Sequence, residues 1–197
     1  MANLIAVSYV TNTIDKEVIR LLNSGAVGFL PSDTIYGLSC RALDEQAVGR
    51  IHRLKKRDKH KPLVVLISST GQLDELGIEL SEVTPALKYW PGQLTIICNT
   101  KKTPAWLQMG TGTQSVRIPG SPGLRRLIAK TGPLISTSAN LAGQEPALNI
   151  AGAKKYFGDK LDFYVNIGML SGKPSTIVKA GPDGLEVIRP GAVDINT

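Results

Sequence analysis

Short apolar runs that alternate with amphipathic segments constrain the fold of this chain more than any other feature. Over Asp15–Leu22 the apolar side chains recur at helical spacing, and Gly25 can end that helix just before the apolar run Ala26–Leu30. A second helix is expected from Asp44, whose carboxylate can cap it, to Leu54, and the run Leu63–Ile67 follows as a buried strand. Helices that alternate with buried strands indicate an α/β fold.

The second half of the chain continues this pattern and then changes it. We expect helices at Val83–Tyr89, Leu124–Ala129 and Ile150–Phe157, and strands at Leu94–Cys98, Ser115–Ile118, Leu134–Ile135, Phe163–Asn166, Thr176–Val178 and Leu185–Ile188. A polar loop with Trp106 should separate the first two of these strands, and Pro182-Asp183-Gly184 should form a turn. Because the strands cluster late, the sequence predicts a twisted, open sheet of mixed parallel and antiparallel strands, flanked by helices.

Composition favours a single domain that spans residues 1–197. Hydrophobic residues make up 42% of the chain and charged residues 20%, and no low-complexity tract suggests a linker. Cys40 and Cys98 are far apart and lack metal-binding spacing, which favours a reducing, cytoplasmic location and no metal site. No apolar run approaches the roughly 18 residues of a membrane span, so we expect a soluble protein without a targeting segment.

Positive charge is concentrated in one short segment. Seven of the 23 Lys and Arg residues, and both His, fall between Arg50 and Lys61. The segment could be a solvated helix end that complements the helix dipole, or a contact for an anion, and the segment alone favours neither. The net charge of +7 favours nucleic acid or an anionic substrate as a partner, without separating the two.

Three hydroxyl-rich loops follow expected strands, at Pro31–Gly37, Ser136–Asn140 and Pro174–Thr176. Loops at strand ends hold ligands in α/β sheets, although each loop alone is more typical of a turn or a helix cap. Their hydroxyls and amides can bind phosphate oxygens or a polar amino acid, and a triphosphate could be neutralised by Arg57, Lys61, Arg117 and Arg189. No Walker loop and no GxSxG motif is present, so we expect no covalent nucleophile.

Seven motifs follow one another along nearly the whole chain, at Leu30–Leu38, Lys55–Leu63, Trp90–Gly92, Ser115–Pro119, Ser136–Asn140, Pro174–Val178 and Ile188–Gly191. In this order they resemble the PT(E/D)T-x-YGL, KxR…(K/N)PL, PGP, VRxP, STSAN, PSTIV and LRxG segments of the YrdC-like family. That family makes threonylcarbamoyl-AMP and pyrophosphate from L-threonine, bicarbonate or carbon dioxide, and ATP, for the modification of tRNA adenosine 37. The resemblance implies a YrdC-like fold in the short, single-domain form.

The resemblance also implies site residues. ATP would be bound by Lys55, Arg57, Lys61, Ser115, Ser136, Ser138, Asn140 and Arg189. Threonine would be held by Ser32, Thr34, Tyr36, Arg117 and Ser175, with Leu38 as a further candidate wall for its methyl group. Arg57 and Lys61 would act in catalysis by neutralising charge, and Mg²⁺ would arrive with the nucleotide. Asp33 could contact a metal-bound water, although a turn-stabilising role is favoured.

Two positions differ from the family pattern: Ser32 replaces Thr with the loss of one methyl, and Leu66 stands where many members carry His. The implied partners are the substrates, the proteins that transfer the threonylcarbamoyl group to tRNA and, as an open question, tRNA itself. Two alternatives also stay open. One is a paralogue that binds structured RNA without making an adenylate, and the other is an enzyme that transfers a carbamoyl group from another donor.

Overall fold

The computed structural model describes residues 8–56, 62–181 and 184–195. Its strands are β1 (Tyr9–Thr11), β2 (Gly28–Pro31), β3 (Tyr36–Arg41), β4 (Val64–Leu66), β5 (Leu94–Asn99), β6 (Thr113–Arg117), β7 (Leu134–Ser138), β8 (Phe163–Val165), β9 (Thr176–Gly181) and β10 (Gly184–Arg189). The α-helices are α1 (Lys16–Asn23), α2 (Glu45–Lys55), α3 (Leu80–Val83), α4 (Ala105–Gln108), α5 (Pro122–Thr131) and α6 (Ile150–Phe157). Short 3₁₀ helices are η1 (Thr70–Gln72), η2 (Asp74–Leu76), η3 (Thr84–Tyr89) and η4 (Gly158–Lys160).

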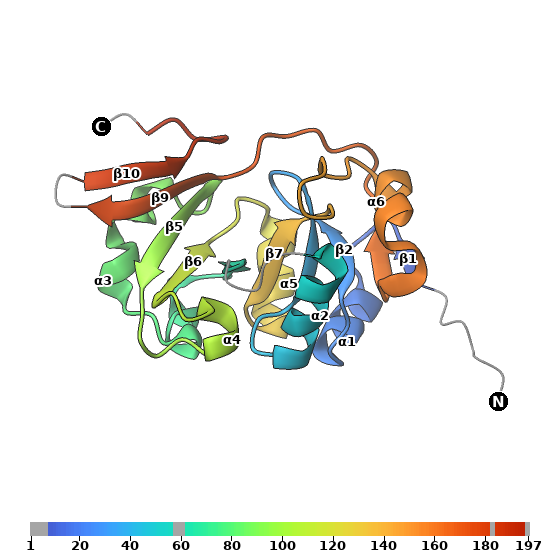
Figure 1. Ribbon diagram of the computed structural model, residues 1–197, viewed down its shortest axis with the longest axis horizontal. Coiled ribbons are helices and arrows are strands. Elements are labelled where there is room, and N and C mark those ends of the chain that lie inside the picture. The colour runs from blue at the N-terminus through green and yellow to red at the C-terminus, as the bar shows by residue number, and fades with distance from the viewer. Residues whose placement is uncertain (1–7, 57–61, 182–183, 196–197) are drawn as a thin grey trace.

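The ten strands form one sheet in the order β1-β8-β2-β3-β7-β4-β6-β5-β9-β10 (Figure 1). Neighbours β1 and β8, β8 and β2, β4 and β6, and β5 and β9 run parallel, whereas the other neighbouring pairs are antiparallel. The predicted α/β fold with an open, mixed sheet flanked by helices is therefore confirmed. Strands from distant parts of the sequence meet at the centre, where the loops after β2 and β6 lie near each other.

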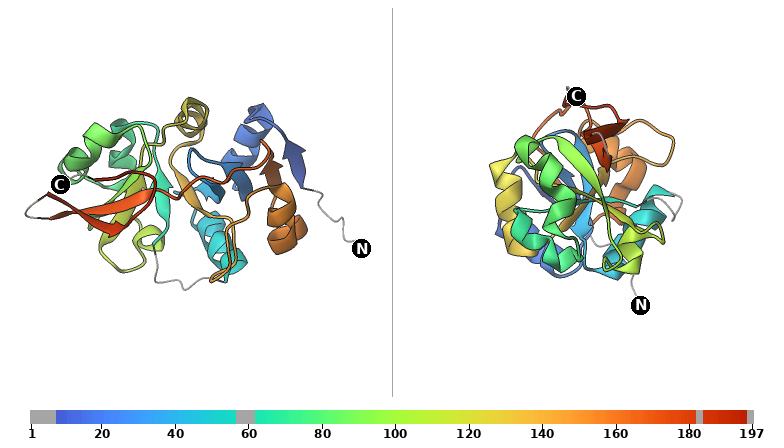
Figure 2. Two further views of the ribbon diagram at one scale, coloured as in Figure 1. Left: turned by 90° about the horizontal axis from the view of Figure 1, so that it is seen from above. Right: turned by 90° about the vertical axis from the view of Figure 1, so that its left-hand side faces the viewer.

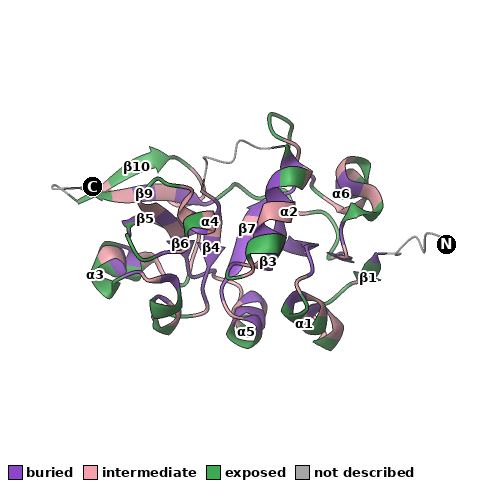
Figure 3. Cartoon of the chain, turned by 60° about the horizontal axis from the view of Figure 1, so that its bottom comes forward, coloured by how far each residue is buried: buried purple, intermediate pink, exposed green. Residues whose placement is uncertain are grey.

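Alternating side chains divide the core into two layers. Leu30, Leu66 and Leu134 pack on one face with α1 and α5, whereas their neighbours Val65 and Ile135 pack on the opposite face with α2 and α6. Figure 2 (left) shows these helix pairs on opposite sides of the sheet, and Figure 3 shows that the central strands are buried. Because successive residues of a strand point to opposite faces, a continuous apolar run is required where both faces are covered.

Side-chain caps fix where the main helices begin. Asp44 Oδ1 accepts a hydrogen bond from Ala47 N at 3.0 Å, as the sequence predicts, and Asp15 caps α1 in the same way. Helix α2 ends at Lys56, whose φ of 49° is left-handed. Helix α2 thus carries the first half of the basic segment, through Lys55, whereas residues 57–61 lie outside the described residues.

Several local expectations are wrong. The segment Val83–Tyr89 is not one α-helix, because Pro85 lacks an N–H and the chain continues as the 3₁₀ helix η3. Trp106 lies in α4 rather than in a loop, and its indole N–H donates to the carbonyl of Ala42 at 3.2 Å. Strands β1 and β3 were not anticipated. Within the described part of the chain, no helix is long and apolar enough to span a membrane.

Candidate functional site

A cavity of about 600 Å³ lies where the loops after β2, β6 and β7 meet the segment before β9. Hydroxyl groups, apolar side chains and two guanidinium groups form its wall. Its polar lining comprises Ser32, Thr34, Tyr36, Arg117, Ser136, Thr137, Ser138, Glu145, Ser175 and Arg189, and its apolar lining includes Leu63, Val64, Leu148 and Ile177. The mixture suits a small ligand that carries both an anionic group and an apolar group.

The loop between β2 and β3 presents ordered hydroxyls. Ser32 Oγ donates to the carbonyl of Ile35 at 2.7 Å and lies 2.8 Å from Thr34 Oγ1. Because a serine hydroxyl has one proton, Thr34 must be the donor in the second bond. Thr34 Oγ1 is thus left to accept hydrogen bonds on its remaining side. The structure keeps Ser32 in this role despite the missing methyl, since only its oxygen makes these contacts.

Arg117, at the end of β6, carries a buried guanidinium group into the wall of the cavity. Its Nη2 lies 3.1 Å from Asp33 Oδ1, and its Nη1 makes a longer contact of 3.5 Å with Thr34 Oγ1. Burial lowers the pKa of Arg117; the negative charge of Asp33 opposes that effect, and the positive charge of Arg189 adds to it. The group stays charged, because a guanidinium is not deprotonated in proteins.

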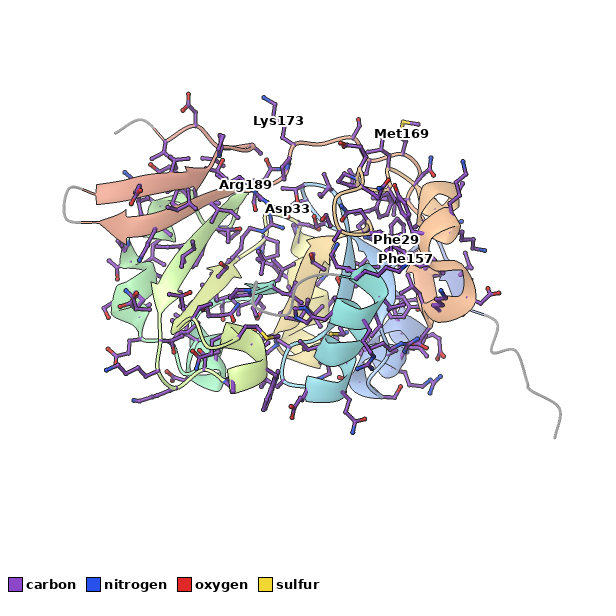
Figure 4. The ribbon with its side chains drawn as sticks, viewed as in Figure 1. Phe29, Asp33, Phe157, Met169, Lys173 and Arg189 are labelled. Carbon is purple, nitrogen blue, oxygen red and sulfur yellow. The ribbon has the colours of Figure 1, made fainter. Side chains whose placement is uncertain are left out.

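Arg189 reaches the cavity from the other side, at the end of β10 (Figure 4). Its Nη2 donates to the carbonyl of Ser175 at 2.7 Å, and Ser175 Oγ lies 2.9 Å from Thr95 Oγ1. A side chain at Gly191 would place its Cβ 2.4 Å from the carbonyl oxygen of Pro174. Glycine is thus required where the hairpin strand packs on the chain that enters β9.

The connection from β8 to β9 crosses above the cavity, at the top of Figure 1, and Met169 and Lys173 mark it in Figure 4. Tyr36 anchors this connection through two hydrogen bonds: its hydroxyl donates to the carbonyl of Gly168 and accepts from the amide of Ile167, both at 2.9 Å. Burial raises the pKa of Tyr36. The ring of Tyr36 stacks on Phe29 with centroids 4.3 Å apart, so this residue joins the core, the connection and the cavity wall.

Lys55, at the end of α2, is buried and holds the loop that follows β7. Its ammonium group donates to the carbonyl of Ser138, to the carbonyl of Asn140 at 3.0 Å and to Asn140 Oδ1 at 2.8 Å. Ser138 Oγ donates to the same Oδ1 at 2.7 Å. The lysine therefore shapes the loop from behind, and the side chain of Asn140 is engaged within the protein.

Comparison with known proteins agrees with this geometry. The Sua5/YciO/YrdC family model, described as telomere recombination, matches residues 20–191. The chain belongs to the Sua5/YciO/YrdC family. It is 36% identical over 169 residues to a threonylcarbamoyl-AMP synthase of Pseudoalteromonas translucida, an alignment that covers 82% of this chain and 90% of that protein.

Two solved structures are similar. The first is P. abyssi Sua5 in complex with L-threonine, with a TM-score of 0.83 and 29% identity; the match covers 93% of this chain. This chain thus spans only 58% of the Sua5 chain. The second is E. coli YciO, with a TM-score of 0.79 and 24% identity, which covers 95% of this chain and 96% of the other. The YciO likeness is evidence for the fold of the complete chain.

The cavity brings together most of the site residues that the sequence singles out. All five threonine candidates line it (Ser32, Thr34, Tyr36, Arg117 and Ser175), together with three of the ATP candidates (Ser136, Ser138 and Arg189). Lys55, Ser115 and Asn140 are not among the lining residues. Arg57 and Lys61 lie outside the described residues. Their roles stay predictions.

Sequence reasoning missed five residues of the wall: Val64, Glu145, Pro146, Leu148 and Gly172. Glu145 and Leu148 follow the STSAN motif, so only the extent of that loop was unforeseen. Gly172 is in contact with the threonine loop, since a Cβ there would lie 2.2 Å from the carbonyl oxygen of Thr34. The one signal in the sequence was the glycine itself, because an isolated glycine can mark a place where two backbones approach closely.

The described residues contain no group of three or more His, Cys, Asp or Glu side chains that could hold a metal ion. Cys40 and Cys98 are both buried and free. Burial raises the pKa of Cys98 to about 12 and that of Cys40 well above its ordinary value. Neither thiol is thus poised as a thiolate at neutral pH.

Proposed function

We propose that this protein makes threonylcarbamoyl-AMP and pyrophosphate from L-threonine, bicarbonate or carbon dioxide, and ATP. The observation that carries the proposal is the buried guanidinium group of Arg117 in the wall of a hydroxyl-lined cavity. Among the described residues, nothing accepts a hydrogen bond from its Nε. A buried guanidinium with unused donors favours a carboxylate ligand, because the two groups match in charge and geometry.

Threonine would bind between Arg117 and the hydroxyls of Ser32, Thr34 and Ser175. Its carboxylate would pair with Arg117, and Thr34 Oγ1 could accept a hydrogen bond from a donor on the amino acid. The ring of Tyr36 would contribute an apolar surface, since its hydroxyl already serves the connection above the cavity. The likeness to P. abyssi Sua5, whose structure was solved in complex with L-threonine, supports this assignment of the substrate.

The reaction would proceed in two steps. The neutral threonine amine adds to carbon dioxide and releases a proton, or condenses with bicarbonate and releases water, and either route gives a carbamate. A carbamate oxygen then attacks the α-phosphorus of ATP, the bond to the bridging oxygen breaks, and pyrophosphate leaves. No protein nucleophile is needed, so positioning and charge neutralisation would supply the catalysis.

The nucleotide would lie on the side of the cavity formed by Ser136, Ser138 and Arg189. Arg57 and Lys61 would neutralise phosphate charge in catalysis, and Mg²⁺ would enter as part of the ATP substrate. Lys55 and Asn140 would act by shaping the loop that presents Ser138. Ser115 stays an ATP candidate from the family resemblance alone.

The proposal is tested by incubating purified protein with ATP, L-threonine and bicarbonate. We expect pyrophosphate release that depends on threonine, together with labile threonylcarbamoyl-AMP detected by mass spectrometry. Pyrophosphate release that is the same without threonine would contradict the proposal. Serine, which lacks only the methyl of threonine, and 2-aminobutyrate, which lacks only its hydroxyl, serve as matched amino acids.

A second measurement addresses the RNA-binding alternative, which the net charge of +7 favours. Affinity for structured RNA should fall steeply as salt rises, because binding to phosphates releases counterions. RNA binding without any adenylate formation would replace the enzymatic proposal with that alternative.

A further inference from the structure

We propose that Asp33 is a positioning residue that fixes the guanidinium group of Arg117 for the substrate carboxylate. This inference rests on the proposed function and adds a residue to its machinery. Asp33 is not among the residues that line the cavity, so it would act only through Arg117.

The carboxylate of Asp33 joins two parts of the chain behind the cavity wall. Its Oδ1 lies 3.1 Å from Arg117 Nη2, and its Oδ2 accepts a hydrogen bond from Gly120 N at 2.7 Å. Gln93 in turn donates to the backbone carbonyl of Asp33. The side chains of Asp33 and Arg117 are only 11% and 4% exposed. This carboxylate is thus held from both sides before any ligand arrives.

The two contacts require a carboxylate rather than an amide. Oδ2 of Asp33 accepts a hydrogen bond from the Gly120 amide, whereas Oδ1 makes no hydrogen bond with the described residues and contacts the Arg117 guanidinium as an ion pair at 3.1 Å. An asparagine side chain offers one acceptor oxygen and one donor NH₂, so it can satisfy only one of the two. Asp33→Asn would therefore either release Gly120 or turn a donor toward Arg117.

Charge gives a second reason for Asp33. Arg117 and Arg189 both line the cavity, and their like charges repel each other. Asp33 supplies a negative charge at Arg117 without entering the cavity. The guanidinium group can then stay in place in the wall before a ligand binds.

The protein contains a matched carboxylate that serves as a control. Asp162 also contacts a backbone amide and an arginine: its Oδ2 accepts from Val27 N at 2.7 Å and from Arg50 Nη1 at 2.5 Å, and its Oδ1 accepts from Arg50 Nη2 at 3.1 Å. Neither Asp162 nor Arg50 lines the cavity. Asp162→Asn thus removes the negative charge from a second Asp–Arg pair without touching the site.

The experiment measures steady-state pyrophosphate release for wild type, Asp33→Asn and Asp162→Asn. For Asp33→Asn we expect the KM for threonine to rise about tenfold while the KM for ATP changes less than twofold. Asp162→Asn should lower thermal stability and leave both KM values unchanged. Asp33→Glu retains two acceptor oxygens and should give a threonine KM between those of wild type and Asp33→Asn; it decides the question if Asp33→Asn does not fold.

A double-mutant cycle separates positioning from a direct role. In an Arg117→Ala background, Asp33→Asn should change the threonine KM no further, because Asp33 acts through Arg117. A full additional effect in that background, or an Asp33→Asn enzyme with the kinetics of Asp162→Asn, overturns the inference while the proposed function stands. Wild type without threonine-dependent pyrophosphate release overturns the proposed function and this inference with it.

Discussion

The two arginines of the cavity are held in different ways. Arg117 ends β6, a strand flanked by β4 and β5 inside the sheet, and only 3% of its surface is exposed. Arg189 ends β10, which is the outer strand of the sheet, and it lies at the exposed side of the molecule. Arg117 pairs with a carboxylate, whereas Arg189 donates to the backbone carbonyl of Ser175.

The two environments suit different ligands: the buried Arg117 suits a group of fixed shape, and the exposed Arg189 suits a group that needs only a positive charge. A guanidinium that is buried and oriented before binding recognises a planar carboxylate with little loss of side-chain entropy. A guanidinium on an edge strand has solvent on one side. Its side chain can therefore adjust to phosphates whose position changes during the reaction. Under the proposed function, this comparison of the two arginines predicts that the sheet interior provides selectivity for the amino acid and that the hairpin tolerates movement of the nucleotide.

Arg117→Ala should have the largest effect. We expect kcat/KM for threonine to fall about 100-fold or more, because a desolvated charge contact is lost. The free energy of unfolding should also fall by about 3–5 kcal/mol, because Asp33 is left buried without its partner. Steady-state kinetics and chemical denaturation measure the two changes. Arg126→Ala, which removes an exposed arginine from α5, is the control and should change neither value appreciably.

Arg189→Ala should have a smaller effect, confined to the nucleotide. We expect the KM for ATP to rise about tenfold, which corresponds to one charge-assisted hydrogen bond, while the threonine KM changes little. Arg189→Lys should restore most of the ATP affinity, because a point charge suffices at an edge strand. Arg117→Lys should not restore threonine binding. Equal behaviour of the two lysine variants would contradict the comparison.

Gly191→Ala tests how the hairpin is docked. A Cβ at this position would lie 2.4–2.6 Å from backbone atoms of Pro174, Ser175 and Thr176, so the strand must shift. We expect a loss of about 1–3 kcal/mol of stability, measured by thermal unfolding. Gly123→Ala in α5 is the control, because its Cβ would meet only ordinary contacts at 3.9 Å. A Gly191→Ala protein as stable as Gly123→Ala would show that the hairpin is loosely attached.

The smallest effect concerns Cys98 in β5, the strand that joins β6 to β9. Its pKa is raised by burial to about 12 in the folded protein, from an ordinary value of 9.0. The unfolded chain thus releases this proton first, and the stability tied to the neutral thiol is complete below pH 9 and is lost as pH rises toward 12.

Thermal unfolding between pH 8 and pH 10.5 checks this expectation. The decline in melting temperature should be shallower for Cys98→Ala than for wild type, and the comparison uses slopes because the substitution also removes buried volume. Identical slopes would assign the decline to other groups. Because a guanidinium is not deprotonated in proteins, raising the pH over this range does not change the difference between Arg117 and Arg189.

The sequence predicts the fold well where burial leaves a clear pattern. Leu63–Ile67 and Leu134–Ile135 are apolar without interruption because helices cover both faces of the sheet there. Strand β3 was missed because it carries Gly37, Ser39 and Arg41 and begins inside what reads as a loop. Strand β1 is three residues long and largely exposed, so its existence depends on pairing with β8, which no local pattern reports.

For the site too, the sequence identifies residue types but not contacts that depend on the tertiary structure. Motif resemblance identified side chains such as Thr34, Arg117 and Ser175 that line one cavity, because these residue types carry the chemistry. It did not indicate that Asp33 pairs with Arg117, since their contact depends on how β2 and β6 are placed in the sheet. Nor did it indicate that Lys55 lies behind its loop, because a lysine in a basic segment reads equally well as a phosphate ligand.

The position of β9 and β10 in the sheet also matters during synthesis. These are the last of the described strands to leave the ribosome, yet β9 pairs with β5, and the wall of the cavity includes Ser175, just before β9, and Arg189, at the end of β10. A nascent chain that has reached α6 already holds Arg117 and Thr34 but only part of the wall. An early stop would therefore leave a protein that carries Arg117, the proposed partner of the substrate carboxylate, without a second wall to close the site.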